Sequence, residues 1–402
     1  MLRLRGGRVS WKMKKKIKIS FDGILNPYLL FFCVWGGSFF LEYLSLVPVI
    51  RSFEYYQYAI VCAVVLAPFF VAWIISRKRR AVAWISEEDV VRKNNLKNLL
   101  ALFWLVATVF EIFYSGGFPL LWKIFGIDKD YFDFGISGLH GLLNGIFFLL
   151  VQIDMLDYFL SGKKASLVFP FFALIWTVVI FSRQMTIVLF LQTLFMYMCF
   201  SGRAMLLKLI AYAFILVVLF GVVGNIRTGN EEFYSLVGVS SGWFLLLPAG
   251  FLWVYVYMAS PISNLMYNLF IDKPVPNYDI GSFFVTLFPK FLRTEMFKSD
   301  NWNPNNLPFE LTGNLENYNL NVGTAFMSGV VSFGFVGLLG MVVIHLVAAY
   351  LLRRSRGWNS VLFYPVVLTS LALSIFAPSL LSLTALFQII LIALLKFSYK
   401  IR

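Results

Sequence analysis

Apolar runs close to 20 residues long recur along this chain of 402 residues, and they constrain its fold more than any other feature. One run, from Ala165 to Phe200, contains a single charged residue, Arg183. Its 36 residues are too many for one membrane span and suit two short spans joined by a tight turn. Only 13% of all residues are charged, whereas a soluble domain carries about 25%. The sequence therefore predicts an all-α polytopic membrane protein.

The first apolar run, from Tyr28 to Val49, is long enough to span a bilayer. No small-residue cleavage site follows it, so we interpret it as a span and not as a signal peptide. Applied to the whole chain, the same length criterion predicts about ten transmembrane helices, at 27–49, 56–76, 96–114, 138–159, 166–182, 184–200, 206–224, 323–351, 360–377 and 379–396.

The net charge of +14 comes from basic residues that cluster beside the ends of the apolar runs. With the predicted spans in place, 25 of the 34 Lys and Arg residues fall on one side of the membrane. Because Lys and Arg accumulate in cytoplasmic loops, this side is predicted to be cytoplasmic, with both termini on it. The protein is thus expected in the inner (plasma) membrane. The bilayer accounts for the basic residues, and no nucleic-acid partner is expected.

The segment 243–270 is apolar enough to cross the membrane, but a crossing would put the basic cluster Arg353 to Arg356 outside. We therefore predict a re-entrant or interfacial helix pair, broken near Pro248 and at Ser260-Pro261. About 50 polar residues then lie on the outer face. The predicted organisation is a basic cytoplasmic N-terminus at 1–26, seven spans in 27–224, a periplasmic loop region at 225–322 that includes 243–270, and three spans with a short cytoplasmic tail in 323–402.

Four basic residues are predicted to mark the outer surface: Arg183 in the hairpin tip, Arg227 after the seventh span, and Lys290 and Arg293 in the large loop. A guanidinium group offers a planar, permanently charged fork that suits two phosphate oxygens at once. Charged residues at membrane depth often face a cavity and serve a function. The alternative is that they reach the lipid headgroups or pair with nearby glutamates.

Glu111 and His140 are predicted to lie at one membrane depth, near the outer ends of the third and fourth spans. Because histidine titrates near neutrality, the two could form a proton-transfer pair. The alternative is that His140 caps a helix or hydrogen-bonds within the bundle. Asp154 and Asp157, near the inner end of the fourth span, could pair with Lys163 or Lys164. His345 is expected to serve in helix packing or in a hydrogen bond between helices.

Several short motifs resemble those of the O-antigen and capsule polymerases, the Wzy-type oligosaccharide repeat-unit polymerases. They are EIFYSGGFPLL, FGISGLHGLLN, the arginine in a membrane hairpin, and NVGTAFMSGVVSFGFVG after a large outer loop. The resemblance covers about 110–340, and the Gly-Gly-Phe-Pro and Gly-Leu-His elements, in this order, carry most of it.

The resemblance implies a helical scaffold of the GT-C type and a defined reaction. A growing glycan on undecaprenyl diphosphate would be transferred to a lipid-linked repeat unit on the outer face of the membrane, without a nucleotide sugar, a metal or another cofactor. Arg183, Arg227, Lys290 and Arg293 would bind the diphosphate. His140 or Glu111 would act as the base, with Glu231 and Asp279 as further candidates. A chain-length regulator and a flippase are the expected protein partners.

Three other functions remain open at this point. An O-antigen ligase would have a similar architecture and would move the finished glycan to a lipid A core. A lipid-linked oligosaccharide flippase or transporter would show repeated halves and short loops on both sides, and neither feature is evident in this sequence. A structural scaffold for an envelope complex is a third alternative.

Overall fold

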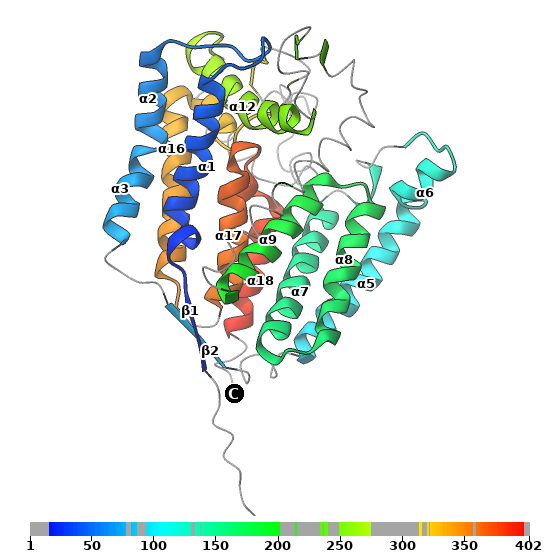
Figure 1. The fold of residues 1–402 in the computed structure, drawn as a ribbon. Coiled ribbons are helices and arrows are strands. Elements are labelled where there is room, and N and C mark those ends of the chain that lie inside the picture. Colours follow the sequence, from blue (N-terminus) through cyan, green and yellow to red (C-terminus); the bar gives the residue numbers. More distant parts are fainter. Residues whose placement is uncertain are drawn as a thin grey trace, which may run out of the picture.

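The structure, a computed structural model, describes residues 16–77, 82–86, 94–129, 133–136, 138–201, 214, 234–235, 237–239, 249–274, 313–315, 320, 322–356 and 359–397. Within these residues the chain is helical, apart from one short two-stranded ribbon (Figure 1). The helices are α1 (Pro27–Tyr43), α2 (Tyr55–Val65), α3 (Ala67–Ser76), α5 (Asn94–Ser115), α6 (Pro119–Ile124), α7 (Leu139–Ser161), α8 (Val168–Val179), α9 (Arg183–Ser201), α12 (Ala249–Phe270), α16 (Met327–Arg354), α17 (Ser360–Ala372) and α18 (Leu383–Phe397).

Three helical stretches of the described part are long and apolar enough to cross a membrane: Leu96–Ile124, Leu139–Ser161 and Met327–Arg354. Helices α2 and α3, which form a bent pair, would together make a fourth span if the pair is a single broken span. Four shorter apolar helices lie on predicted spans, at Lys164–Val179, Gln184–Phe200, Ser360–Ile375 and Leu383–Leu395. The structure is consistent with a helical membrane protein, whereas about ten spans and a GT-C scaffold stay predictions. The predicted span at 206–224 lies outside the described helices.

Helices α7 and α17 form the interior of the bundle. Every residue of α7 from Gly145 to Leu156 is buried, because α5, α8, α9 and α18 surround it. Helix α17 packs against α9 on one side and against α1 on the other. Together with α18 it lies between the group α1, α3 and α16 and the group α5, α7, α8 and α9 (Figure 1).

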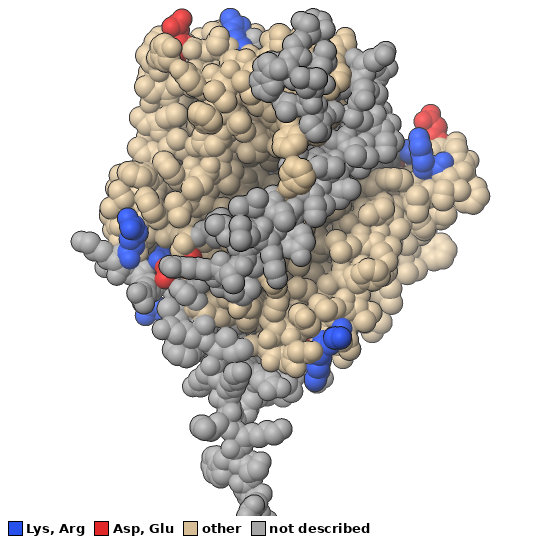
Figure 2. All heavy atoms as spheres, viewed as in Figure 1, with Lys and Arg blue, Asp and Glu red and all other residues tan. Residues whose placement is uncertain are grey.

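The outward faces of the peripheral helices are apolar. Large side chains are exposed along α5, such as Leu102 and Phe113, and along α8, such as Val168 and Phe171. Figure 2 shows a broad band without charged atoms on the described part of one face, with Lys, Arg, Asp and Glu confined to its margins. Water would disfavour an apolar band of this kind, and the hydrocarbon core of a bilayer favours it.

A two-stranded ribbon lies at one end of the bundle (Figure 1). Strand β1 (Lys16–Ser20) pairs antiparallel with β2 (Val82–Ser86), with Lys18 opposite Trp84. Both segments were predicted to be cytoplasmic, and neither was predicted to be a strand. The alternation of KIKIS has the period of two that a strand requires.

Helices α2 and α3 cover the predicted span 56–76, but they are bent by 40° where they meet. Pro68 is the second residue of α3 and lacks the N–H group that would continue the hydrogen bonding of α2. The prediction of one span here is compatible with this break.

Helix α12 occupies most of the predicted re-entrant segment. It is continuous from Ala249 to Phe270 with Pro261 inside it, so the predicted break at Ser260-Pro261 is wrong. Figure 1 shows part of α12 oriented across the direction of α1 and α16, at the end of the bundle opposite the ribbon. Its Tyr255 hydroxyl accepts a hydrogen bond from Leu46 N at 2.7 Å, which ties it to the connection after α1. The second predicted break, near Pro248, lies at the edge of the described residues.

Helix α16 contains a sharp kink at Gly334, which has φ 59° and ψ −136°. Only glycine adopts this backbone conformation without strain. The kink brings the start of the helix back onto its continuation, so that a Cβ on Gly337 would lie 1.8 Å from Gly329 O. Small residues in apolar helices commonly let neighbouring helices approach closely. Gly329 and Gly337 instead permit contact within α16 itself.

Two ionisable groups of α7 have partners other than those predicted. Asp154 forms an ion pair with Lys97 of α5, and Asp157 accepts a hydrogen bond from Ser166 Oγ at 2.5 Å, so the prediction of Lys163 or Lys164 is wrong. The predicted packing role of His345 is confirmed, since the side chain is fully buried beside Phe326 and its Nδ1 lies 2.8 Å from Met341 O.

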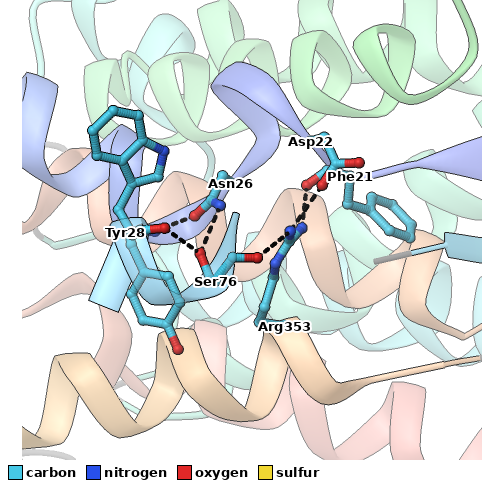
Figure 3. A network of polar contacts seen from close by, with 7 residues as sticks. Phe21, Asp22, Asn26, Tyr28, Ser76 and Arg353 are labelled. Carbon is cyan, nitrogen blue, oxygen red and sulfur yellow. Dashed lines mark hydrogen bonds and ion pairs between the residues drawn. The ribbon is translucent and has the colours of Figure 1, made fainter. Parts of the chain in front are cut away.

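Arg353 holds three segments together at the ribbon end of the bundle (Figure 3). Its Nη1 donates to Phe21 O at 2.7 Å, and its Nη2 donates to Asp22 Oδ1 at 2.8 Å and to Ser76 O at 3.5 Å. Asn26 adds a second link, because its Nδ2 donates to Ser76 Oγ at 3.2 Å. The segment before α1, the end of α3 and the end of α16 are therefore joined by one guanidinium group.

We expect Arg353→Lys to lower the free energy of unfolding by about 1–3 kcal/mol, because one ammonium group cannot serve these acceptors together. The measurement is thermal unfolding of the purified protein in detergent. Arg354→Lys is the matched control, since Arg354 is exposed and its Cζ lies over the Tyr350 ring, 5.0 Å from the centroid, with no hydrogen bond or ion pair to a described residue. Equal losses in the two variants would contradict the role of Arg353.

Candidate functional site

Glu111 and His140 are in direct contact. Glu111, in the last turns of α5, is 1% exposed, and its Oε2 lies 3.0 Å from Nδ1 of His140 in the first turn of α7. The imidazole is 27% exposed. A carboxylate at Nδ1 favours the tautomer with the proton on Nδ1, which leaves Nε2 free to accept a proton. The structure thus brings the two predicted residues together, while their catalytic role stays a prediction.

The loop before α7 fixes the carboxylate of Glu111 from the other side. Ile136 N donates to Glu111 Oε1 at 3.0 Å, and Gly135 N donates to Ser115 Oγ at 2.9 Å. Gly135 has φ +84°, and a Cβ at this position would lie 2.9 Å from His140 Nδ1. A glycine is therefore required both by the backbone conformation and by the space that the ion pair occupies.

An aromatic side chain restricts the orientation of the imidazole. Phe134 lies edge-on to the His140 ring, with centroids 5.4 Å apart and an interplanar angle of 84°. Phe134 in turn contacts Trp122 and Trp176, each with ring centroids 6.3 Å away. Because these rings come from the loop, α6 and α8, packing as well as hydrogen bonding sets the position of His140.

His140 lines a pocket of about 410 Å³ between the helices. Its walls come from α7, from the turn between α8 and α9 with the first half of α9, from the end of α17, and from the start of α18. The lining is rich in amide and hydroxyl side chains, including Asn144, Gln184 and Ser379. Among the described lining residues, His140 is the one ionisable side chain, and Glu111 lies behind it.

Three helices begin at the rim of this pocket. Helix α7 starts after Gly138, α9 after Ser182 and α18 after Ser382, and all three of these residues line it. Ser182 Oγ accepts from Met185 N and Ser382 Oγ accepts from Ala385 N, each at 3.3 Å. The first N–H groups of a helix have no partner within it, and the helix dipole is positive there. Three such ends make the rim favourable for an anion.

Farther from the rim, three glutamines join three helices. Gln152 of α7 donates to Gln192 of α9 at 2.9 Å, and Gln192 and Gln388 of α18 exchange two hydrogen bonds of 3.0 Å each. All three side chains are buried, and Gln192 and Gln388 line the pocket. They were not predicted as site residues. The available signal was a glutamine in the interior of each of three predicted spans, Gln152 in 138–159, Gln192 in 184–200 and Gln388 in 379–396.

The predicted diphosphate-binding residues are described only in part. Arg183 begins α9 between two residues that line the pocket, Ser182 and Gln184, although its side chain is not among those described. Arg227, Lys290 and Arg293 lie outside the described residues, as do the further candidates Glu231 and Asp279. Within the described residues, no three His, Cys, Asp or Glu side chains gather closely enough to hold a metal ion.

Comparison of the chain with known protein families, with curated proteins and with solved structures finds no match. The function is therefore argued from the geometry of the pocket and from the short motifs of the sequence.

Proposed function

We propose that the protein polymerises undecaprenyl-diphosphate-linked oligosaccharide repeat units on the outer face of the inner membrane, to make an O-antigen, capsular or exopolysaccharide. One observation carries the proposal. His140, which is paired with Glu111, lines a polar pocket, and three helix N-termini form the rim of this pocket. A base beside an anion-favouring rim is what transfer of a glycan from a lipid diphosphate requires.

In the proposed reaction, His140 Nε2 accepts the proton of an acceptor hydroxyl. The hydroxyl oxygen bonds to the anomeric carbon of the growing chain. The bond from this carbon to the diphosphate oxygen breaks, and its electron pair leaves with undecaprenyl diphosphate. Glu111 does not line the pocket, so we assign it the positioning of His140 and stabilisation of the imidazolium that forms.

The diphosphate would lie at the rim, where the N-termini of α7, α9 and α18 offer partial positive charge. Arg183 enters α9 at this rim, and its guanidinium is suited to binding phosphate oxygens. We propose that Arg227, Lys290 and Arg293, from the outer loop region, complete the binding of the diphosphate. This arrangement would use a GT-C-like scaffold of about ten spans.

Sidedness is supported by the two ends of the bundle. The end of α3, the end of α16 and the connection between α7 and α8 lie at the ribbon end (Figure 1). Basic residues occur in all three places: Arg77 follows α3, Arg353 is in the last turn of α16, and Lys163 lies between α7 and α8. Strands β1 and β2 are hydrogen-bonded and so lie on one side of a membrane, which requires an even number of crossings between them. One crossing by α1 and one by the bent pair α2–α3 meet this requirement. The ribbon end would be cytoplasmic and the pocket rim would face outward.

Deletion of the gene followed by gel analysis of surface polysaccharide tests the proposed reaction. Loss of a polymerase leaves glycans of a single repeat unit on the surface. Loss of a ligase or of a flippase leaves no such glycan there, and either result would replace the proposal by that alternative. If the protein were a structural scaffold, a gene that encodes a His140 variant would restore the normal polysaccharide to the deletion strain.

Labelling of single cysteines tests the sidedness. We expect a cysteine at the exposed Lys123, in the last turn of α6, to react with an impermeant maleimide in intact cells, and one at the exposed Lys163 to react only after lysis. Cys33, Cys62 and Cys199 are replaced by serine or alanine beforehand. The opposite labelling pattern would invert the proposed topology and remove the pocket from the outer face.

A further inference from the structure

The pocket continues inward past the Glu111–His140 pair. Gly141, next to His140, packs on Leu383, while a Cβ on Gly145 would lie 3.4 Å from Gln388 N. Because α7 rises by 1.5 Å per residue, Gln388 lies roughly 6 Å deeper than the level of Gly141. This depth is about the width of one sugar ring. A ligand whose one edge lies near His140 can therefore reach the side chains at the inner end of the pocket with its other edge.

The amides at this inner end keep unused hydrogen-bonding capacity. Each carboxamide has two N–H donors and an oxygen with two lone pairs. With its partners among the described residues, Gln388 uses one donor and one lone pair, both toward Gln192. One donor and one acceptor of Gln388 thus remain for a ligand. Gln192 keeps one donor, since its oxygen already accepts from Gln152 and Gln388.

Thr369 adds a hydroxyl that has no hydrogen-bond partner in the described part of the chain. It is 2% exposed, it lines the pocket, and its Oγ1 makes no hydrogen bond to any described residue. Hydroxyls in helices commonly donate to a carbonyl of the preceding turn, as Ser370 Oγ does to Val366 O at 2.9 Å and Thr177 Oγ1 does to Leu174 O at 2.9 Å. A buried hydroxyl without this hydrogen bond destabilises the fold unless a molecule in the pocket forms a hydrogen bond to it.

Uncharged groups suit this region and charged groups do not. The described lining side chains around Gln388 and Thr369 carry no formal charge, and His140 stands at the rim. A carboxylate or phosphate placed beside the two amides would lose its hydration without gaining a counter-ion. Hydroxyl groups, in contrast, can both donate to and accept from amides and a threonine.

We infer that the inner end of the pocket is a subsite for an uncharged pyranose ring, and that it discriminates against acidic sugars. The identity of this ring as the acceptor sugar rests on the proposed function. Its reacting hydroxyl would lie near His140, while its other hydroxyls would bond to Gln388 and Thr369. The three glutamines also join their helices, but that structural role does not require the free hydroxyl of Thr369.

Saturation-transfer NMR on the full chain in lipid nanodiscs tests the subsite. The probes are methyl glucoside and methyl N-acetylglucosaminide as uncharged sugars and methyl glucuronoside as a charged one, each measured with excess inorganic pyrophosphate to occupy the anion-favouring rim. We expect transfer to at least one uncharged probe and none to the charged probe. Equal transfer to charged and uncharged probes, or transfer to none of them, would overturn the inference.

Two valine substitutions separate recognition from folding. Thr369→Val preserves the shape of the side chain and removes a hydroxyl that has no partner among the described residues, so the fold should be unaffected. We expect it to weaken binding of the uncharged probe by about three- to tenfold. Thr177→Val is the matched control, since this buried threonine lies on α8 and does not line the pocket. Unchanged affinity in Thr369→Val, or an equal loss in both variants, would contradict the subsite.

The binding assay requires no turnover, so its result does not depend on whether the proposed reaction takes place. Sugar binding together with normal glycan lengths in variants of His140 would end the polymerase proposal and leave the subsite standing. Short glycans in those variants together with no sugar binding would end the subsite alone.

Discussion

Replacement of His140 by glutamine is expected to reduce the rate of glycan polymerisation by about 10²–10⁴-fold, the usual contribution of a general base. Glutamine retains much of the size of the imidazole and can still hydrogen-bond to Glu111, but it cannot accept the proton of the acceptor. The measurement is the rate of conversion of lipid-linked repeat units into longer glycans by the purified protein in liposomes. A rate unchanged in His140→Gln would remove this residue from the reaction.

Glu111→Gln separates the two members of the pair. The substituted side chain can still accept from Ile136 N, but it lacks the negative charge that would stabilise an imidazolium. We expect a smaller loss than for His140→Gln, about 10–100-fold in kcat with KM unchanged. Thermal unfolding of both variants serves as the control for folding. A larger effect of Glu111→Gln on KM than on kcat would indicate a role in substrate binding and contradict the assignment.

Alanine at Gly337 is expected to be among the most destabilising single substitutions in the described part of the chain. A Cβ there would lie 1.8 Å from the oxygen and 2.3 Å from the carbonyl carbon of Gly329, and both are backbone atoms that cannot rotate away. Overpacking typically costs about 1–3 kcal/mol, and the kink in α16 leaves little room for relaxation, so the loss should reach the upper end of this range. Thermal unfolding in detergent measures it.

Gly340→Ala provides the matched control for this substitution. Gly340 lies one turn farther along the same helix, and a Cβ there would meet no atom within 4 Å. Because alanine is favoured over glycine inside a helix, this variant should be unchanged or more stable by up to about 1 kcal/mol. If Gly337→Ala and Gly340→Ala unfold at the same temperature, the contact within α16 does not carry the proposed strain.

Much of the helical framework could be predicted from apolar run length alone. The hairpin of α8 and α9 follows from a run that is too long for one span, and α7 follows from the run 138–159. The contact between Glu111 and His140 was also predictable, because residues at equal depth on consecutive antiparallel spans can meet. These features depend on local sequence and on a bilayer of known thickness.

Other features depend on contacts and backbone conformations that the lengths of the apolar runs do not predict. The glutamines of α7, α9 and α18 meet only because three helices, distant in sequence, pack at one level. The kink at Gly334 requires a backbone conformation that glycine permits, but a glycine in the sequence does not by itself predict a kink. Helix α12 continues through Pro261, where the sequence indicated a break, because packing can compensate for the hydrogen bond that a proline removes.

The pairing of β1 with β2 has a consequence for how the chain is made. The first strand leaves the ribosome before α1, and its partner emerges only after α3. The first strand therefore has no partner until α1, α2 and α3 have been synthesised. Once β2 has emerged, the ladder can close a loop that contains these three helices. The strand pairing thus allows the first part of the chain to form a closed unit early, against which the later helices would assemble.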